Sequence, residues 1–253
     1  MIKSVVNQIL GWTPYEIRRK RNERVLPDAT FETIKLALAY HLLSKRLPAF
    51  VQIGACDGIS GDPVHDFIVQ GHVRALLVEP IQESLLKLQR TYEGVPNVTV
   101  VHAAIGCHDG DVVLFRVKEG ATSLDSFWAT QLASFNRAHL VRHGVKEHDI
   151  EEVKVPCLTL KTLLSKHGFE TLDLLQIDTE GFDGEVVKMA LELAIPPETI
   201  NFENVHLTVE ATAEVFGRLE KSGYAWTHDK WDTFAVHQRL FQRWAQNGGT
   251  AAR

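Results

Sequence analysis

The sequence predicts an α/β fold in which helices cover both faces of a mostly parallel sheet that ends in an antiparallel hairpin. Short, nearly all-apolar runs alternate along the chain with amphipathic segments. A turn containing Gly54 and Gly58 follows the first apolar run, and a polar HDKWD segment separates the last two. Apolar strands alternating with helices are typical of a parallel sheet buried on both faces. The final pair of runs indicates the hairpin.

The elements are expected in a regular order. The parallel strands are predicted at residues 49–54, 75–79, 98–102, 172–178 and 199–203. The helices are predicted at residues 31–45, 63–70, 82–92 and 185–193, and the hairpin strands at residues 224–227 and 233–237. Asp62 followed by Pro63 favours a helix that begins there, because an N-cap acceptor precedes a proline at the first helical position.

Nothing in the sequence marks a second large domain, since it has no internal repeat, low-complexity tract or long Pro/Gly/Ser linker. The 253 residues, of which 45% are hydrophobic, suit one domain with a sizeable core. We expect a helical N-terminal segment at residues 1–48 that packs on the domain, a main domain at residues 49–246 and a disordered tail at residues 247–253.

The composition and the charge of the chain indicate which binding partners and which cellular compartment to expect. The chain has 27 basic and 32 acidic residues, a formal net charge of −5, which argues against a nucleic-acid partner. Three widely spaced cysteines form no disulfide framework and favour a reducing cytoplasm. No apolar run approaches the roughly 18 residues that span a bilayer. A basic run at residues 18–21 follows residues 2–17, so this segment could rest on an anionic membrane surface, although packing on its own domain is the preferred interpretation.

The turn after the first strand, within FVQIGACDGISGDP, predicts a nucleotide-cofactor site. It consists of Gly54, Ala55, Cys56, Asp57 and Gly58. Glycines let the backbone approach a ligand where a Cβ would clash. Asp57 would repel a dinucleotide pyrophosphate but attract the ammonium and sulfonium of S-adenosylmethionine. Because Cys56 also replaces a middle glycine, the turn favours S-adenosylmethionine; a turn without any ligand is the alternative.

Glu79 ends the second strand, one strand–helix–strand unit after Gly54, and Pro80 follows it. An acid at this point of a Rossmann-like sheet accepts hydrogen bonds from ribose hydroxyls. The third strand continues into AAIG, where the small side chain of Ala104 would leave room for an adenine ring. The alternative is an ordinary surface glutamate at a strand end.

The densest group of carboxylates, in LLQIDTEGFDGE, follows the strand at residues 172–178. Ligands of open α/β sheets bind at the carboxyl ends of the strands, so Asp178 and Glu180 would lie where methyl donor and acceptor meet. Glu203 and His206 come after the next strand. A hydroxyl acceptor must lose a proton during methyl transfer, and we expect the base in the order Asp178, His206, Glu180. Several carboxylates could instead hold Mg²⁺ that lowers the pKa of the hydroxyl.

Other reactive side chains receive structural interpretations. His139, His143 and His148 lie in one helix-and-loop stretch, but no carboxylate or cysteine has ligand spacing with them, so no metal site is predicted there. Cys56 is expected to be a small packing residue rather than a nucleophile. Asp109 is expected to belong to an ordinary turn.

Five blocks of the sequence, in this order, resemble the FkbM-type family of S-adenosylmethionine-dependent methyltransferases: FVQIGACDG, LLVEP, AAIG, LLQIDTEGFDGEV and INFENVHL. They run from Phe50 to about Leu207, and the segments CLTLKTLLSKHG and DTFAV fit the same family. The resemblance implies a class I methyltransferase (Rossmann-like) fold. It also implies O-methylation of a hydroxyl on a sugar, glycan or secondary metabolite.

The resemblance further implies roles for individual residues. Gly54, Asp57, Gly58 and Glu79 would bind S-adenosylmethionine, and Asp178, Glu180 and Glu203 would edge the acceptor site, with Asp178 contacting the cofactor as well. The family commonly has Asn where Cys56 stands, so a polar contact with the methionine moiety is expected to be missing. Ser123, within GATSLDS, resembles a family segment near the cofactor.

Two other functions stay open. An NAD-dependent oxidoreductase or epimerase would have a glycine-rich turn without Asp57 and a Tyr/Lys pair at the hydride site, and the sequence offers neither. A catalytically inactive relative would keep the fold and the cofactor site but has no need for the acids around Asp178.

Overall fold

The computed structural model describes residue 37, residues 47–121, residues 131–240 and residue 242. Its centre is a seven-stranded sheet with the strand order β10-β11-β9-β8-β1-β2-β3. The parallel strands are β1 (Ala49–Ile53), β2 (Arg74–Val78), β3 (Val98–Val101), β8 (Leu174–Ile177) and β9 (Thr199–Glu203). The antiparallel hairpin consists of β10 (Tyr224–His228) and β11 (Asp232–His237), and β11 pairs with β9. The predicted mostly parallel sheet with a terminal hairpin is confirmed.

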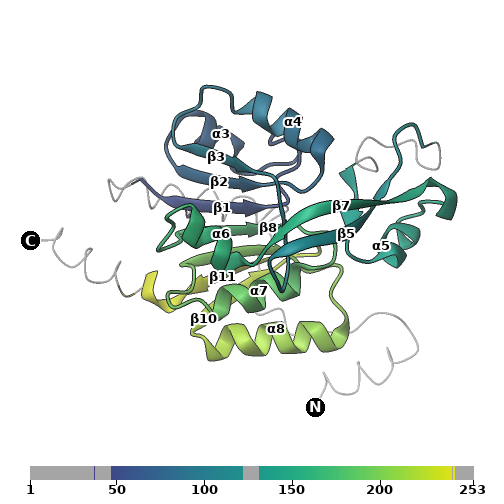
Figure 1. Ribbon diagram of the computed structural model, residues 1–253. Helices are drawn as coiled ribbons and strands as arrows, with labels where there is room; N and C mark the ends of the chain where they lie inside the picture. Colours follow the sequence, from purple (N-terminus) through teal and green to yellow (C-terminus); the bar gives the residue numbers. More distant parts are fainter. Residues whose placement is uncertain (1–36, 38–46, 122–130, 241, 243–253) are drawn as a thin grey trace, which may run out of the picture.

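Helices cover both faces of this sheet, as the apolar strands predict (Figure 1). On one face, α6 (Leu160–Lys166), α7 (Asp183–Leu191) and α8 (Val209–Lys221) enclose the larger hydrophobic core. On the other, α3 (His65–Val69) and α4 (Gln82–Thr91) enclose a second core that includes Phe50 and Leu77. A strand with both faces buried has no polar side to alternate with, which explains the continuous apolar runs.

A second, four-stranded sheet was not predicted. Its strand order is β4-β7-β5-β6, formed by β4 (Ala104–Ile105), β7 (Ile150–Leu158), β5 (Gly110–Val117) and β6 (Ala133–Ser134). Figure 1 shows β5 and β7 as a long pair beside the main sheet, with α5 (Arg137–Arg142) next to them. A 3-10 helix (Glu147–Asp149) leads into β7. We call this second sheet, formed by β4, β5, β6 and β7, together with α5 the arm.

Two helix starts differ from the prediction. The helix expected from Pro63 begins at His65, with Val64 as its N-cap residue, and the Asp62 carboxylate accepts a hydrogen bond from the Val64 N–H at 2.8 Å. The helix expected from residue 185 begins at Asp183. The predicted helix at residues 31–45, the packing of residues 1–48 and the tail at residues 247–253 lie outside the described residues, apart from residue 37.

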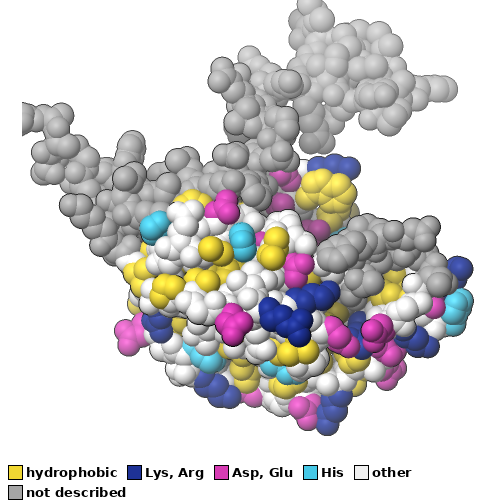
Figure 2. Space-filling view, turned by 90° about the horizontal axis from the view of Figure 1, so that it is seen from above, with side chains coloured by type: hydrophobic (Ala, Val, Ile, Leu, Met, Phe, Trp, Pro, Cys, Tyr) yellow, Lys and Arg dark blue, Asp and Glu magenta, His cyan; other side chains and the backbone are white. Residues whose placement is uncertain are grey.

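The charges on the surface and the length of the helices are informative about nucleic-acid and membrane partners. The face seen in Figure 2 carries acidic, basic and apolar side chains side by side, without a continuous basic stripe among its described residues. Within the described ranges, no helix is both long and apolar enough to cross a membrane. Cys56, Cys107 and Cys157 are free thiols.

Candidate functional site

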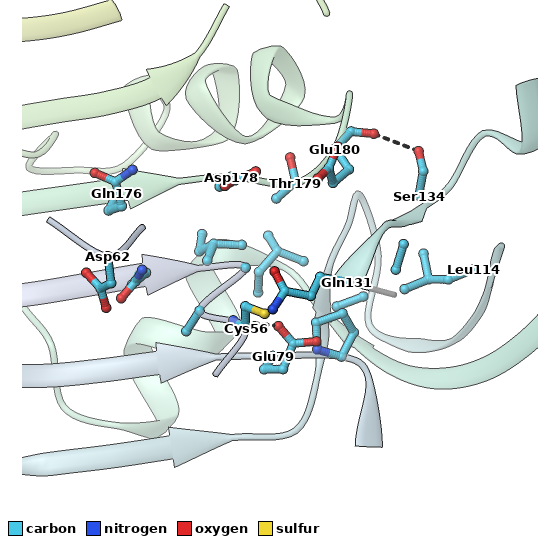
Figure 3. Close-up of a pocket in the computed structure, with 18 of the residues that line it drawn as sticks. Cys56, Asp62, Glu79, Leu114, Gln131, Ser134, Gln176, Asp178, Thr179 and Glu180 are labelled. Carbon is cyan, nitrogen blue, oxygen red and sulfur yellow. Dashed lines mark hydrogen bonds between the residues drawn. The ribbon is translucent and has the colours of Figure 1, made fainter. Parts of the chain in front are cut away.

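A cleft opens at the carboxyl ends of β1, β2 and β8, between the main sheet and the arm (Figure 3). Gly54 begins the turn that forms its floor and has a φ of +81°. The N–H groups of Gly54 and Ala55 both donate to the carbonyl oxygen of Val78, at 2.9 and 3.0 Å. Cys56 also has a left-handed backbone, with a φ of +48°. The turn therefore lies flat against the strand ends and exposes its backbone to the cleft.

Glu79 connects this turn to β2. Its carboxylate accepts hydrogen bonds from the N–H of Cys56 at 2.9 Å and from the N–H of Ile81 at 2.8 Å. The side chain is only 5% exposed. Burial raises the pKa of Glu79 to about 7, although the two N–H donors act in the opposite direction. Glu79 lines the cleft, with its carboxylate beside Cys56 (Figure 3).

The environment of Cys56 in the turn disfavours its thiolate form. Burial, together with the negative charges of Glu79 and Asp57, raises the pKa of the Cys56 thiol to about 12. A thiol with such a pKa is protonated at neutral pH and is no nucleophile. The structure is consistent with the predicted packing role.

Asp57 and Gly58 belong to the same turn but do not line the cleft. The Asp57 carboxylate accepts hydrogen bonds from the N–H groups of Ile59 and Ser60 and from the Ser60 hydroxyl. Gly58 packs against α4, where an added Cβ would lie 2.5 Å from Cε2 of Tyr92. In this structure Asp57 folds the turn, and a direct contact with a cofactor stays a prediction.

Polar side chains that were not predicted line one end of the cleft. Gln52 of β1 and Gln176 of β8 are in-register neighbours that both line it. These residues are 6% and 8% exposed, and the Oε1 atom of each is buried without a hydrogen-bond partner among the described residues. Asp62 lines the same end, and burial raises its pKa to about 6. The detectable signal was a glutamine at the matching position of two otherwise apolar strands, AFVQI and LLQI.

Asp178 follows β8 and lines the middle of the cleft. Asp178 is exposed to the cleft. Desolvation of its carboxylate raises the pKa of Asp178 well above its usual range, and the negative charges of Glu180 and Asp183 add to the effect. A group whose pKa is shifted in a cleft is a candidate for proton transfer.

The turn after Asp178 is tightly held. The fully buried Asp183 carboxylate accepts hydrogen bonds from the N–H groups of Thr179 and Gly181, both at 3.1 Å. Glu180 adopts a left-handed φ of +52° within this turn. The Ser134 hydroxyl of the arm donates to the Glu180 carbonyl oxygen at 2.7 Å. The turn thereby joins the main sheet to the arm.

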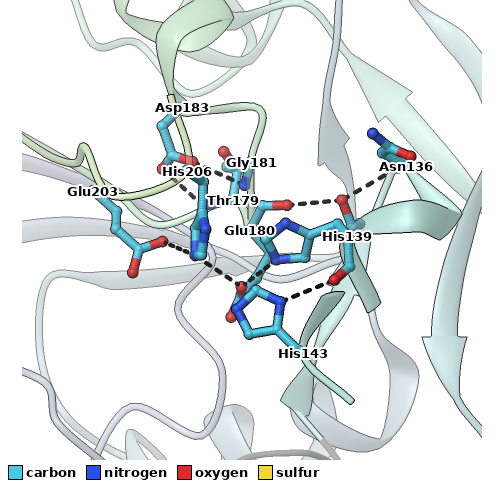
Figure 4. Close-up of polar contacts among 10 residues, drawn as sticks. Asn136, His139, His143, Thr179, Glu180, Gly181, Asp183, Glu203 and His206 are labelled. Carbon is cyan, nitrogen blue, oxygen red and sulfur yellow. Dashed lines mark hydrogen bonds and ion pairs between the residues drawn. The ribbon is translucent and has the colours of Figure 1, made fainter. Parts of the chain in front are cut away.

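Beside the cleft, the Glu180 side chain meets one histidine from α5 and one from the loop after β9 (Figure 4). Its Oε2 atom lies 3.0 Å from Nε2 of His139 and 3.9 Å from Nε2 of His206. His206 also pairs with Glu203, at 3.1 Å between Nε2 and Oε2. A hydrogen bond with Glu203 raises the pKa of His206 above its usual value. No carboxylate has ligand spacing with His139 in the sequence, and the fold brings Glu180 to it from 41 residues away.

The predicted site residues fall into three groups. Those that line the cleft are Gly54, Ala55, Cys56, Glu79, Pro80, Ala104, Asp178 and Glu180. Glu203 and His206 lie outside the lining and join it through Glu180. Asp57 and Gly58 support the turn, and Ser123 lies outside the described residues. Leu114 and Ser134 of the arm, and Gln131 just before β6, also belong to the lining.

Mg²⁺ does not suit the donors next to the cleft. Two overlapping groups of three side chains have ligand atoms close enough to share one ion: His139, His143 and His206, and Glu180, Glu203 and His206. Mg²⁺ prefers oxygen ligands, whereas three of these five side chains offer nitrogen. The predicted Mg²⁺ is therefore not supported.

A comparison with protein families finds a match. The family model of the methyltransferase FkbM domain matches residues 52–234. A solved FkbM methyltransferase from Methylobacillus flagellatus KT is 16% identical, with a TM-score of 0.48, and the match covers 76% of this chain and 44% of that one. The METTL16 methyltransferase domain is 10% identical, with a TM-score of 0.47, over 82% of this chain and 66% of that one. Aeropyrum pernix fibrillarin in complex with S-adenosyl-L-methionine is 12% identical, with a TM-score of 0.40, and the match covers 80% of this chain and 74% of that one.

The chain thus spans less than half the length of the Methylobacillus flagellatus protein. No curated protein sequence matches it.

Proposed function

This chain belongs to the FkbM methyltransferase family, and we propose that it is an S-adenosylmethionine-dependent O-methyltransferase acting on a hydroxyl of a sugar, glycan or secondary metabolite. One observation carries the proposal. A single cleft is lined both by the Gly54 turn with Glu79 and by Asp178 with Glu180. Residues suited to a nucleoside cofactor and residues suited to proton transfer therefore face the same space.

The cleft residues fit S-adenosylmethionine, which supplies a methyl group activated on a sulfonium. Glu79 would accept hydrogen bonds from the ribose hydroxyls, and Ala104 at the neighbouring strand end leaves space for the adenine. At the opposite end, Gln52 and Gln176 present buried carbonyl oxygens that lack a donor. An ammonium group carries three N–H donors and would satisfy them, with the Asp62 carboxylate beside it.

Proton removal from the acceptor is assigned to Asp178. Its raised pKa makes it a better proton acceptor than an ordinary aspartate, and it lines the middle of the cleft. His206 is the second choice, because it reaches the cleft only through Glu180, and Glu180 is the third. Orientation of the acceptor against the methyl group would supply most of the remaining rate.

The acceptor is proposed to be a small molecule or a glycan rather than a nucleic acid. The net charge of −5 and the mixed charges on the face in Figure 2 support this choice. The carboxylates around Glu180 would also repel a phosphodiester backbone.

Calorimetric titration of the purified chain with S-adenosylmethionine, S-adenosylhomocysteine and NAD⁺ in parallel tests the proposal. We expect micromolar binding of both adenosyl compounds and no binding of NAD⁺. Binding of NAD⁺ alone would favour the oxidoreductase or epimerase. If the adenosyl compounds bind but no hydroxyl acceptor of the proposed classes is methylated, the chain is a catalytically inactive relative.

A further inference from the structure

Three histidines, two from α5 and its end and one from the loop after β9, converge beside the cleft. His139 lies on α5 and His143 is its C-cap residue, one turn further on, so their side chains project from the same side of the helix. The ring centroids of His139 and His206 are 4.5 Å apart, and those of His143 and His206 are 5.0 Å apart. His139 is 1% exposed and the other two are half-buried. Figure 4 shows the three rings gathered around the Glu180 carboxylate.

The candidate ligand atoms lie close together. One nitrogen from each of His139, His143 and His206 lies within 4.8 Å of the others, and the same limit holds for Glu180, Glu203 and His206. Ligands about 2.0–2.2 Å from a common Zn²⁺ ion are separated by roughly 3–4 Å, so small side-chain shifts would close the three histidines around one ion. Glu180 joins them because its Oε2 atom lies 3.0 Å from Nε2 of His139 and 3.9 Å from Nε2 of His206.

Two contacts orient the histidines before any ion is present. Nδ1 of His143 lies 2.9 Å from the carbonyl oxygen of His139, and because a carbonyl can only accept, Nδ1 must donate. This tautomer leaves Nε2 of His143 as the ligating nitrogen, the arrangement that outer-shell hydrogen bonds give to metal-binding histidines. His139 lies against Gly181, where an added Cβ would be 3.2 Å from its Nδ1. Gly181 thus makes room for the ring.

The charge around the cluster calls for a cation. Among the described residues, Glu180 and Glu203 form ion pairs only with histidines, never with Lys or Arg. Asp178 and Asp183 add two more carboxylates nearby. A network of histidines and glutamates could be balanced by protonating the imidazoles, but three imidazolium ions with adjacent rings would repel one another.

We propose that His139, His143, His206 and Glu180, supported by Glu203, bind one divalent transition-metal ion of the Zn²⁺ type at the edge of the cleft. Imidazole-rich donor sets suit Zn²⁺, Fe²⁺ and Ni²⁺, and the carboxylate balances part of the charge. The site holds α5 of the arm against the turn after β8. Metal binding itself is independent of the proposed methyl transfer.

A second consequence rests on the proposed function. Glu180 both lines the cleft and belongs to the ligand set, so the ion would lie next to the acceptor. A divalent ion there would bind the acceptor hydroxyl and lower its pKa, which assists removal of the proton by Asp178.

The test uses the full chain, stripped of metal with a chelator and titrated with Co²⁺ followed by visible absorption, and with Zn²⁺ followed by calorimetry. We expect one ion per chain and a Co²⁺ spectrum typical of nitrogen ligands. The variants His143→Ala and His206→Ala should bind Zn²⁺ more than about 100-fold more weakly, because losing a ligand exceeds the loss of an outer-shell partner. His72→Ala, an exposed histidine before β2, is the matched control and should bind like the wild type.

Thermal melting and S-adenosylmethionine calorimetry of each variant show whether it is folded. His143 and His206 are replaced in separate variants, so the test needs only one of the two variants to fold. If the wild type and the folded variants bind Zn²⁺ equally, the metal site does not exist. Zn²⁺ binding without S-adenosylmethionine binding would support the site and overturn the proposed function, and the reverse result would do the opposite.

Discussion

Gly54 approaches the main chain of Asp178 so closely that a Cβ on Gly54 would lie 1.7 Å from the Asp178 carbonyl oxygen. This approach sets the turn of the proposed cofactor site against the proposed base. Because the obstructing atom belongs to the backbone directly after the central strand β8, no side chain can move to relieve the clash. We expect Gly54→Ala to lower the free energy of unfolding by at least about 3 kcal/mol, measured by chemical denaturation, or to prevent folding.

The control for this prediction is Gly94→Ala. Gly94 also has a left-handed φ, +75°, but no atom lies within 4 Å of the added Cβ. It should lose only about 1–2 kcal/mol, the strain of a left-handed alanine. If the two variants lose the same free energy of unfolding, the close approach to Asp178 adds nothing to the destabilisation by Gly54→Ala.

The main sheet was predictable because each of its central strands is buried on both faces. A continuous apolar run ends where its buried part ends, so Glu79 and Asp178 could be placed at the carboxyl edge without knowing any contact. The arm was not predictable in this way. β5 and β7 mix exposed, half-buried and buried residues over eight and nine positions, and charged residues interrupt their apolar ones, so neither strand has the all-apolar run of the central strands.

The contacts of the site were harder to predict than its strands. Glu180 was recognised as a site residue, but its histidine partner comes from the arm, and its fixed place depends on that sheet and on Ser134. Spacing along the sequence carries no information about a contact made across two sheets. Gln52 and Gln176 were visible as polar residues in apolar strands, and only the register of β1 and β8 shows that they are neighbours.

Gln176→Met tests whether the polar end of the cleft is built for a ligand. Met is close to Gln in shape and removes a buried oxygen without a partner, an arrangement that destabilises a folded protein by about 1–3 kcal/mol. We expect the melting temperature to stay level or rise, and the affinity for S-adenosylmethionine in calorimetry to fall by at least about tenfold. A gain in stability with lost binding is typical of residues kept for function.

Gln70→Met is the control, since Gln70 is exposed at the end of α3 and outside the cleft. It should change neither property. A Gln176→Met protein that melts lower and binds normally would mean that Gln176 serves packing alone.

The pKa of Glu79 predicts how cofactor affinity depends on pH. With a pKa of about 7 in the free protein, the carboxylate ionises as the pH rises from 6 to 8. Only the ionised form can accept ribose hydroxyls and the two backbone N–H groups together, so the affinity for S-adenosylmethionine should increase through pH 7 and level off above it. Calorimetry at several pH values measures this.

Stability should follow the opposite course. The pKa of Glu79 is raised on folding from an ordinary value of 4.5, so its contribution to stability is full below pH 4.5 and is lost as the pH rises through about 7. Better folding therefore cannot explain the gain in affinity. Glu79→Gln should bind more weakly at pH 8 and lose the Glu79 component of the pH dependence; an unchanged profile in this variant would assign the effect to another group.

Asp178→Asn separates proton transfer from cofactor binding. The amide keeps the shape of the side chain but cannot take a proton, so we expect S-adenosylmethionine affinity within about threefold of the wild type and turnover lower by at least about 100-fold. Turnover is measured as S-adenosylhomocysteine released with an acceptor found by screening. Loss of binding would instead place Asp178 in the cofactor site alone.

A readout that needs no acceptor comes from the same variant. The raised pKa of Asp178 means that its negative charge is unfavourable in the folded state, because of desolvation and the carboxylates of Glu180 and Asp183. This part of the stability is lost as the pH rises, so Asp178→Asn should melt higher than the wild type, and by more at pH 8 than at pH 5. Asp111→Asn, at an exposed position of β5, should show no such trend. If Asp178→Asn melts at the same temperature as the wild type at both pH values, the negative charge of Asp178 does not destabilise the folded protein. The argument for Asp178 as the base would then fail.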